Sequence, residues 1–310
     1  QGHQILVLAR DKDVLLQLLQ EEGGEYRIFG QHRKNLRDKI LETPKLIFRY
    51  LSIARQWKPD VIISKASFYG CVVAKLVHAK SVIFPDSEVV KVTNRYVVPL
   101  ASMVITPACF ALDFGHKHHR IQGFFEDCYL APSVCHTAPV LHDSPYAVLR
   151  FVGWFANHDV NNSGFSLSQK KQLIDAIRPY MKVYISSEKP LPDELQQFRL
   201  PTPANQIHSV LAYADLYLGD SQTMATEAAL LGCPAIRSNS FVGPDDMTNF
   251  RVLEQQYGLL RNIRSFADLL PVVQDMAQHS RKADWLSRRQ SYFASVGDAN
   301  AQILSLLSSL

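Results

Sequence analysis

The stretch "GDSQTMATEAALLGCPAI", Gly219 to Ile236, decides the fold of this chain. The apolar residues Leu216 to Leu218 predict a buried strand, and the alanine-rich run that follows predicts a helix ending at Gly232. A polar elbow, Asp220 to Thr223, therefore joins a strand directly to a helix. The first N–H groups of such a helix have no partner within it, and in open α/β sheets they lie where ligands bind.

The alternation of strands and helices continues along the rest of the chain. A linker near residues 131–145, rich in proline and small residues, separates two series of predicted strands: Gln4–Ala9, Val61–Ser64, Ser81–Phe84 and Met103–Thr106, then Tyr146–Phe151, Lys182–Ser186, Leu216–Gly219 and Pro234–Arg237. We predict an α/β protein with two Rossmann-like domains, residues 1–140 and 141–310, and a ligand cleft between them. Because a doubly wound sheet normally opens with a central strand and a ligand-facing loop, and this chain opens with "QGH", we expect that the first strand and loop are missing.

Composition narrows the class of protein. With 47% hydrophobic and 20% charged residues, the 310-residue chain is typical of a globular protein. It has no apolar run of the roughly 18 residues that span a bilayer, and its start is unlike a signal peptide, so we expect a cytoplasmic location. The five cysteines show no zinc-like spacing and are expected to be packed thiols, and we predict neither a metal nor a cofactor.

The elbow is a candidate anion site. Ser221 and Thr223 supply hydroxyls, and the positive end of the following helix favours a phosphate or diphosphate. Met224 opens the inward stripe of the helix and is counted with the ligand-binding residues, and Glu227 shares a face with Thr223. The alternative is that Ser221 or Thr223 only caps the helix and that Glu227 only interacts with its dipole.

The segment "RFVGWFANHDV" is the equivalent turn after the first strand of the second half. Gly153 permits a tight backbone, Arg150 offsets phosphate charge, and the His158–Asp159 pair supplies an imidazole near a leaving group. The alternative is a loop stabilised by an Asx turn, with Trp154 packed instead of contacting a ligand.

Two further loops follow predicted strands. In "SSEKP", Ser186, Ser187 and Glu188 are candidates for contacts with nucleoside hydroxyls or the base, with helix capping as the alternative. In "FPDSEVV", Asp86 and Glu88 are candidates for the general base that takes a proton from an acceptor hydroxyl, with solvated charge as the alternative.

These segments resemble the domain-of-unknown-function family 354. The resemblance extends to about Ile263 and is most specific in "LRFVGWFANHDVNNSG", "YISSEKPLP", "YADLYLGDSQTMATEAALLGCPAIR" and "VITPACF". The family usually begins with a strand and a proline- and histidine-bearing loop that this chain lacks, and it has a histidine where Val89 stands here.

Members of that family look like GT-B glycosyltransferases and non-hydrolysing nucleotide-sugar 2-epimerases. The resemblance implies transfer of a sugar from a nucleotide diphosphate donor to an acceptor in surface polysaccharide or glycolipid synthesis, without a metal. It also implies that Glu227 binds the ribose hydroxyls. One alternative is a nucleotide-sugar 2-epimerase, but Lys91 and Val92 occupy positions where such an enzyme is expected to have acidic residues. The other alternative is a non-catalytic nucleotide-sugar-binding protein.

Basic residues concentrate in residues 33–58. This segment has eight basic and two acidic residues, a net charge of +6 against +4 for the whole chain, so the remainder carries −2. It also contains many apolar residues, which predicts an amphipathic helix interrupted at Pro44. One expectation is a peripheral position on anionic lipid at the inner membrane face, and the alternative is an apolar side packed on its own domain. We see no module that reads nucleic acid.

Overall fold

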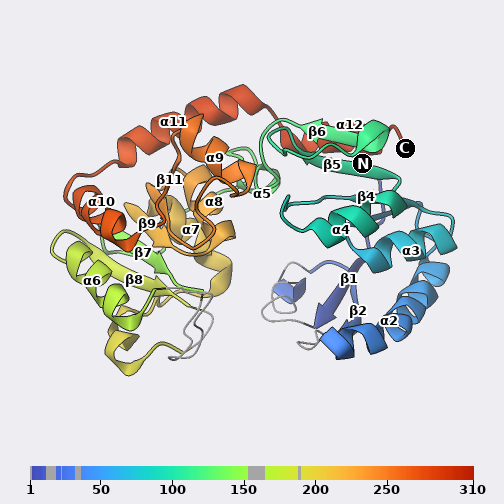
Figure 1. Ribbon diagram of the computed structural model, residues 1–310, viewed down its shortest axis with the longest axis horizontal. Coiled ribbons are helices and arrows are strands. Elements are labelled where there is room, and N and C mark those ends of the chain that lie inside the picture. Colours follow the sequence, from blue (N-terminus) through green and yellow to red (C-terminus); the bar gives the residue numbers. More distant parts are fainter. Residues whose placement is uncertain (1, 12–18, 22, 32–35, 153–164, 188–189) are drawn as a thin grey trace. The chain divides into compact units, whose positions relative to one another are not determined.

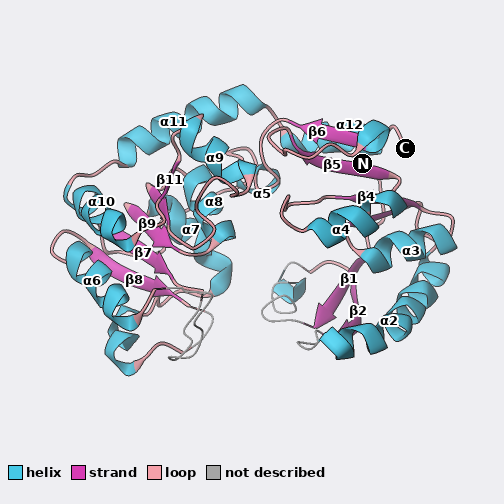
Figure 2. Ribbon diagram, in the orientation of Figure 1, coloured by secondary structure: helices cyan, strands magenta, loops and turns pink. Residues whose placement is uncertain are grey.

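The computed structural model describes residues 2–11, 19–21, 23–31, 36–152, 165–187 and 190–310. The chain divides into two compact units, each of mixed α/β structure (Figures 1 and 2). Unit 1 comprises Gln1–Thr106, Leu112–Arg120 and Leu310, and unit 2 comprises Pro107–Ala111 and Ile121–Ser309.

Unit 1 contains two separate sheets. The first pairs two parallel strands, β1 (Val7–Asp11) and β2 (Tyr26–Gln31). The second has the order β3-β4-β5-β6, with β3 (Val61–Ser64), β4 (Lys80–Ile83), β5 (Met103–Pro107) and β6 (His118–Ile121). In the described part of the chain no strand joins β1 to β3, so the two sheets stay unconnected.

The long helix α2 (Leu36–Trp57) covers the core of unit 1. Its residues Leu46, Tyr50 and Ala54 recur every four positions and pack against Phe29 of β2 and Ile62 of β3. Two shorter helices follow, α3 (Phe68–Leu76), capped by the Ser67 hydroxyl, and α4 (Lys91–Tyr96). One helix therefore contributes to a core shared by both sheets.

Unit 2 is built on a five-stranded sheet in which the four strand pairs are parallel. Its order is β11-β10-β9-β7-β8, with β7 (Tyr146–Arg150), β8 (Lys182–Ser186), β9 (Leu216–Gly219), β10 (Ala235–Arg237) and β11 (Leu260–Asn262). All residues of β7, β9 and β10 are buried, as expected for a parallel sheet covered on both faces. The four strands predicted for this half are confirmed, and β11 is additional.

Helices connect and cover these strands. They are α5 (Asp127–Leu130), α6 (Leu167–Ile177), α7 (Ile207–Tyr213), α8 (Gln222–Leu230), α9 (Thr248–Gln255), α10 (Phe266–Gln278), α11 (Lys282–Val296) and α12 (Ala299–Leu307). The alanines of α8 are buried, which lets this helix approach the sheet closely. Across the described ranges, no helix has both the length and the apolar character needed to span a bilayer. All five cysteines are free thiols; Cys71 and Cys233 are buried, and the other three are partly buried.

Candidate functional site

The order of strands in unit 2 makes the carboxyl ends of β7 and β9 a candidate ligand site. After β7 the chain goes to β8 on one side, and it then returns to β9 on the other side of β7. The carboxyl ends of β7 and β9 lie next to each other, with Arg150 paired to Gly219. Open α/β sheets bind ligands outside the carboxyl ends of the strands at such a switch of direction.

The predicted elbow lies at this switch point. Helix α8 begins at Gln222, three residues after β9 ends, and Ser221 is its N-cap, with its hydroxyl oxygen accepting from the Met224 N–H at 3.4 Å. Thr223, in the first turn, is exposed, whereas Met224 packs against the core of unit 2. Ser221 thus caps the helix as the alternative proposed, while its hydroxyl hydrogen is still available to a ligand.

Gly219 allows the two central strands to approach closely. A Cβ atom at this position would lie 2.6 Å from both the Arg150 carbonyl oxygen and the Tyr217 hydroxyl. Tyr217 is fully buried, and its hydroxyl has no hydrogen-bond partner among the described residues. A side chain at position 219 would therefore push β9 away from β7.

A polar cluster links the ends of β7, β8 and β9. The Arg150 guanidinium donates to the Ser186 hydroxyl at 3.2 Å, and Ser187 follows in the next position with intermediate exposure. Lys170 of α6 is buried, with its ammonium 5.2 Å from the centre of the Phe151 ring. Burial lowers the pKa of Lys170, and the nearby carboxylate of Asp220 opposes that shift. Two buried cations therefore lie close to the elbow.

Glu227 is the centre of a second cluster, one turn further along α8. Its Oε1 accepts from the Tyr129 hydroxyl at 3.0 Å and lies 3.4 Å from the His208 Nε2. The Tyr129 and His208 rings contact each other, with centres 5.6 Å apart. Burial, and then the Glu227 charge, raise the pKa of Tyr129. The Glu227 side chain is 13% exposed, so helices α5, α7 and α8 together hold a carboxylate that solvent reaches.

The candidate bases lie in unit 1, after β4. The Asp86 carboxylate forms an ion pair of 2.5 Å with the Lys65 ammonium, and both side chains are largely exposed. The Asn94 amide donates to the backbone oxygens of Ser87 and Glu88, each at 3.4 Å. Proton transfer by Asp86 or Glu88 stays a prediction.

Several predicted residues lie outside the described part of the chain. They are Gly153, Trp154, His158, Asp159 and Glu188. Among the described residues, no group of three or more His, Cys, Asp or Glu side chains lies close enough together to hold a metal ion.

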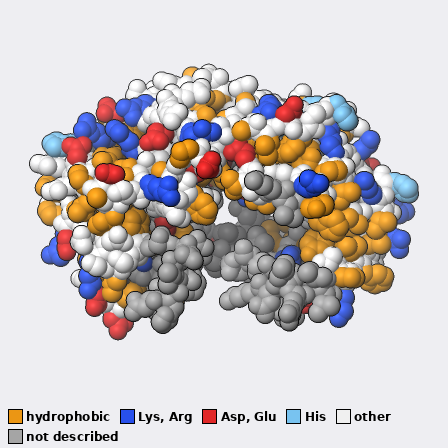
Figure 3. Space-filling view, viewed as in Figure 1, with side chains coloured by type: hydrophobic (Ala, Val, Ile, Leu, Met, Phe, Trp, Pro, Cys, Tyr) orange, Lys and Arg blue, Asp and Glu red, His pale blue; other side chains and the backbone are white. Residues whose placement is uncertain are grey.

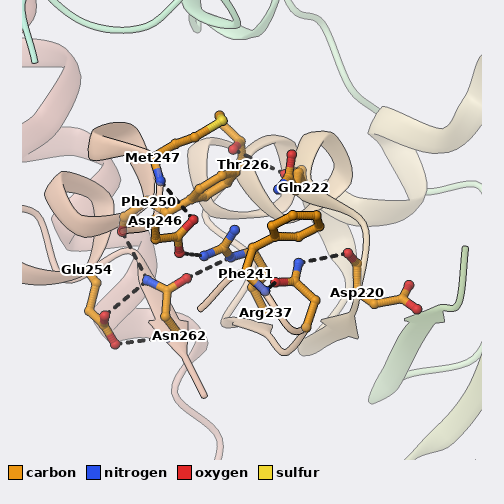
Figure 4. Close-up of polar contacts among 11 residues, drawn as sticks. Asp220, Gln222, Thr226, Arg237, Phe241, Asp246, Met247, Phe250, Glu254 and Asn262 are labelled. Atoms are coloured by element: carbon orange, nitrogen blue, oxygen red, sulfur yellow. Dashed lines mark hydrogen bonds and ion pairs between the residues drawn. The ribbon is translucent and has the colours of Figure 1, made fainter. Parts of the chain in front are cut away.

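A buried arginine network that sequence reasoning missed lies beside the elbow (Figure 4). Arg237, the last residue of β10, is fully buried and forms an ion pair with Asp246. Its Nε donates to the Asn262 Oδ1 at 2.8 Å, and the guanidinium lies 3.6 Å from the centre of the Phe250 ring. Asn262 also donates to Glu254 at 3.0 Å. The network holds the loop after β10, and its only signal in the sequence is an arginine that closes an apolar strand.

The two mixed α/β units with parallel sheets have a fold of the GT-B type. The structure is similar to Acinetobacter baumannii MurG, with 15% identity, a TM-score of 0.58, and coverage of 100% of this chain and 92% of that one. It is similar to a putative UDP-N-acetylglucosamine 2-epimerase from Listeria monocytogenes, with 12% identity, a TM-score of 0.63 and coverage of 95% and 83%. It is also similar to Anabaena HepE, solved in complex with UDP, with 16% identity, a TM-score of 0.55 and coverage of 98% and 92%.

Comparison of the sequence with protein-family models identifies one family. Residues 1–131 match the family model described as "Protein of unknown function (DUF354)", which confirms the resemblance over this part of the chain. The segments from Leu149 onward that also suggested the family lie beyond the match. A comparison with curated proteins finds no significant match.

Proposed function

We propose that unit 2 binds the diphosphate of a nucleotide sugar at the carboxyl ends of β7 and β9, and that the protein transfers the sugar to an acceptor hydroxyl. The observation that carries this proposal is the start of α8 at the topological switch point, three residues after β9 ends. The first N–H groups of α8, the hydroxyls of Ser221 and Thr223, and the charge of Arg150 suit an anion.

The ribose is assigned to Glu227. One of its oxygens already accepts from Tyr129 and lies near His208, and the second oxygen is available for the ribose hydroxyls. A carboxylate fixed on two sides loses little side-chain freedom when a ligand binds, which favours affinity.

In the transfer step, the acceptor oxygen forms a bond with the anomeric carbon of the sugar. The bond from that carbon to the diphosphate breaks, and the diphosphate leaves with the electron pair. The hydroxyl proton passes to a base, for which Asp86 and Glu88 are the candidates. The N-terminus of α8 stabilises the negative charge that develops on the departing diphosphate.

Epimerisation at C2 of the sugar is the second candidate function. The similarity to the putative 2-epimerase from Listeria monocytogenes, with a TM-score of 0.63, favours it. An epimerase needs no acceptor, so product analysis separates the two reactions.

The experiment is a thermal-shift screen of nucleotide sugars followed by product analysis. A glycosylated acceptor supports the proposal, whereas an epimerised nucleotide sugar formed without an acceptor supports the second candidate. Binding without turnover indicates a non-catalytic binding protein. If UDP and the other nucleoside diphosphates all leave the melting temperature unchanged, the proposal is wrong.

The acceptor is proposed to reach the protein at an anionic membrane surface. The apolar stripe of α2 packs into the core of unit 1, so it cannot enter lipid as a free amphipathic face would. The opposite face carries exposed Lys45, Arg49 and Arg55 around Phe48, which is 71% exposed. Hydrophobic side chains gather on the surface over α2 and α3 (Figure 3). Each basic residue near an anionic surface contributes about 1 kcal/mol.

Co-sedimentation with liposomes tests the membrane proposal. Binding should require anionic lipid, fall with added salt and decrease when Lys45, Arg49 and Arg55 become Gln. A matched variant removes three exposed charges from unit 2 instead, Lys182, Arg199 and Arg261. Equal losses for both triple variants, or no pelleting at low salt, would exclude a specific role for α2.

A further inference from the structure

Asp220 connects the two central strands at the site. It is the first residue after β9, and its N–H donates to the Arg150 carbonyl oxygen at 3.2 Å. Its carboxylate Oδ1 accepts from the Val152 N–H at 2.7 Å. Val152 lies two residues beyond the end of β7, so one residue of the elbow is bonded to the backbone just past β7.

Asp220 also holds the loop after β10. Its carbonyl oxygen accepts from the Asn239 amide at 3.1 Å, and the Asn239 Oδ1 accepts from the Phe241 N–H at 3.1 Å. The other end of this loop is fixed by the ion pair of Arg237 with Asp246. Three strand ends therefore meet at a single aspartate.

We propose that Asp220 is a positioning residue: its carboxylate fixes the Val152 backbone at the end of β7 against the elbow, while its backbone oxygen holds the loop after β10, and both contacts shape the phosphate site. This inference rests on the proposed function. The Asp220 carboxylate accepts a hydrogen bond from the Val152 N–H. An ionised carboxylate can only accept hydrogen bonds, so it suits a backbone donor and does not suit a phosphate. Asp220 thus acts through the loops it holds and not through contact with the ligand.

The environment of Asp220 supports this role. Burial raises its pKa, while the Val152 N–H and the charges of Lys170 and Arg150 oppose the rise. Removing the carboxylate breaks the hydrogen bond that ties the Val152 backbone to the elbow. The backbone at Val152 would then be free to shift away from the elbow.

The same two strands supply a matched control at their opposite ends. Asp215, just before β9, donates its N–H to the Tyr146 carbonyl oxygen at 2.8 Å, and its carboxylate accepts from the Tyr146 N–H at 3.1 Å. This repeats the bonding of Asp220 with β7, at the amino ends of the strands. A purely structural role predicts the same consequences for Asp215→Ala and Asp220→Ala.

The test measures UDP affinity by calorimetry in Asp220→Ala, Asp220→Asn and Asp215→Ala. We expect Asp220→Ala to weaken UDP binding by about tenfold, the fold-change that corresponds to the loss of the one Val152–Asp220 hydrogen bond. Asp220→Asn keeps an acceptor oxygen for Val152 and should stay within about twofold of the parent affinity. Asp215→Ala should leave affinity unchanged. Normal affinity in Asp220→Ala, or equal losses in Asp215→Ala and Asp220→Ala, would overturn the inference.

Hydrogen exchange without ligand separates this inference from the proposed function. The Val152 amide should exchange faster in Asp220→Ala and at the parent rate in Asp220→Asn. If no nucleoside diphosphate binds the parent protein, the proposed function is wrong. The exchange measurement still tests whether the Asp220 carboxylate fixes the Val152 backbone. Unchanged exchange at Val152 in Asp220→Ala would overturn the inference whatever the ligand.

Discussion

Asp246→Ala should be among the most destabilising single changes in unit 2. The partner of Asp246 is the guanidinium of Arg237, which is fully buried. After the substitution, that cation keeps one hydrogen bond to Asn262 and its contact with the Phe250 ring. The Met247 N–H, which donates to Asp246 at 2.9 Å, also loses its acceptor.

The magnitude follows from what remains buried. Removing one partner of a buried ion pair costs about 3–5 kcal/mol, because the other charge is left uncompensated. The Arg237 Nη1 is already without a partner among the described residues, so the site has no spare acceptor to offer. Replacing both residues, Arg237→Met with Asp246→Leu, removes the charge itself and should recover most of the loss.

Urea denaturation measures these differences. The three tryptophans are Trp57 in unit 1 and Trp154 and Trp285 in unit 2. In a Trp57→Phe background, tryptophan fluorescence therefore reports on unit 2 alone. A loss below about 1 kcal/mol for Asp246→Ala would refute the reasoning, since it would mean that water or a rearranged side chain compensates the cation. A double variant as unstable as the single one would refute it equally.

Three further predictions concern the elbow and the core of unit 2. Replacing Ser221 and Thr223 together by Ala should weaken UDP binding in calorimetry by roughly 1.5–3 kcal/mol for each lost hydrogen bond to the charged ligand. Glu227→Gln should weaken binding of UDP more than of inorganic pyrophosphate, because its proposed partner is the ribose. Burial raises the pKa of Asp127 to about 6, so the folded state keeps a proton that the unfolded state releases above pH of about 4. Unfolding free energy measured by urea should therefore fall by roughly 3 kcal/mol as pH rises from about 4 through about 6, and Asp127→Asn should abolish this dependence.

Each of these predictions has an outcome that contradicts it. Unchanged UDP affinity in the double alanine variant, with the fold intact, would remove the elbow from the ligand site. Equal losses of UDP and pyrophosphate in Glu227→Gln would give that residue a structural role. Identical pH profiles for the parent and Asp127→Asn would show that the unfolding equilibrium does not depend on that carboxyl.

The strands that the sequence predicts are those with continuous apolar runs. β7 and β9 are short, fully buried and rich in aliphatic residues, and both were predicted at nearly their observed bounds. β11 was missed because it has three residues, of which Arg261 is exposed, so it has no apolar pattern to detect. β2 was missed because Arg27 and Gly30 interrupt its apolar residues.

The candidate site also has a part that the sequence predicts and a part that it does not. The elbow was predictable because the strand, the cap and the helix are contiguous in sequence. The partners of Glu227 and Arg237 were not, since Tyr129 lies 98 residues from Glu227 and Asn262 lies 25 residues from Arg237. Such pairs follow from how the helices and loops pack, and no local pattern encodes them.

The crowding at Gly219 limits how this protein can change by mutation. Even alanine adds a carbon atom where the Arg150 carbonyl oxygen and the Tyr217 hydroxyl leave only 2.6 Å. In a library of all twenty residues at this codon, selection for folded protein should return glycine alone, while Thr223, which is exposed, should accept many residues. The end of β9 therefore requires a residue without a side chain, and sequence variation in the site is possible only at the residues that follow Gly219.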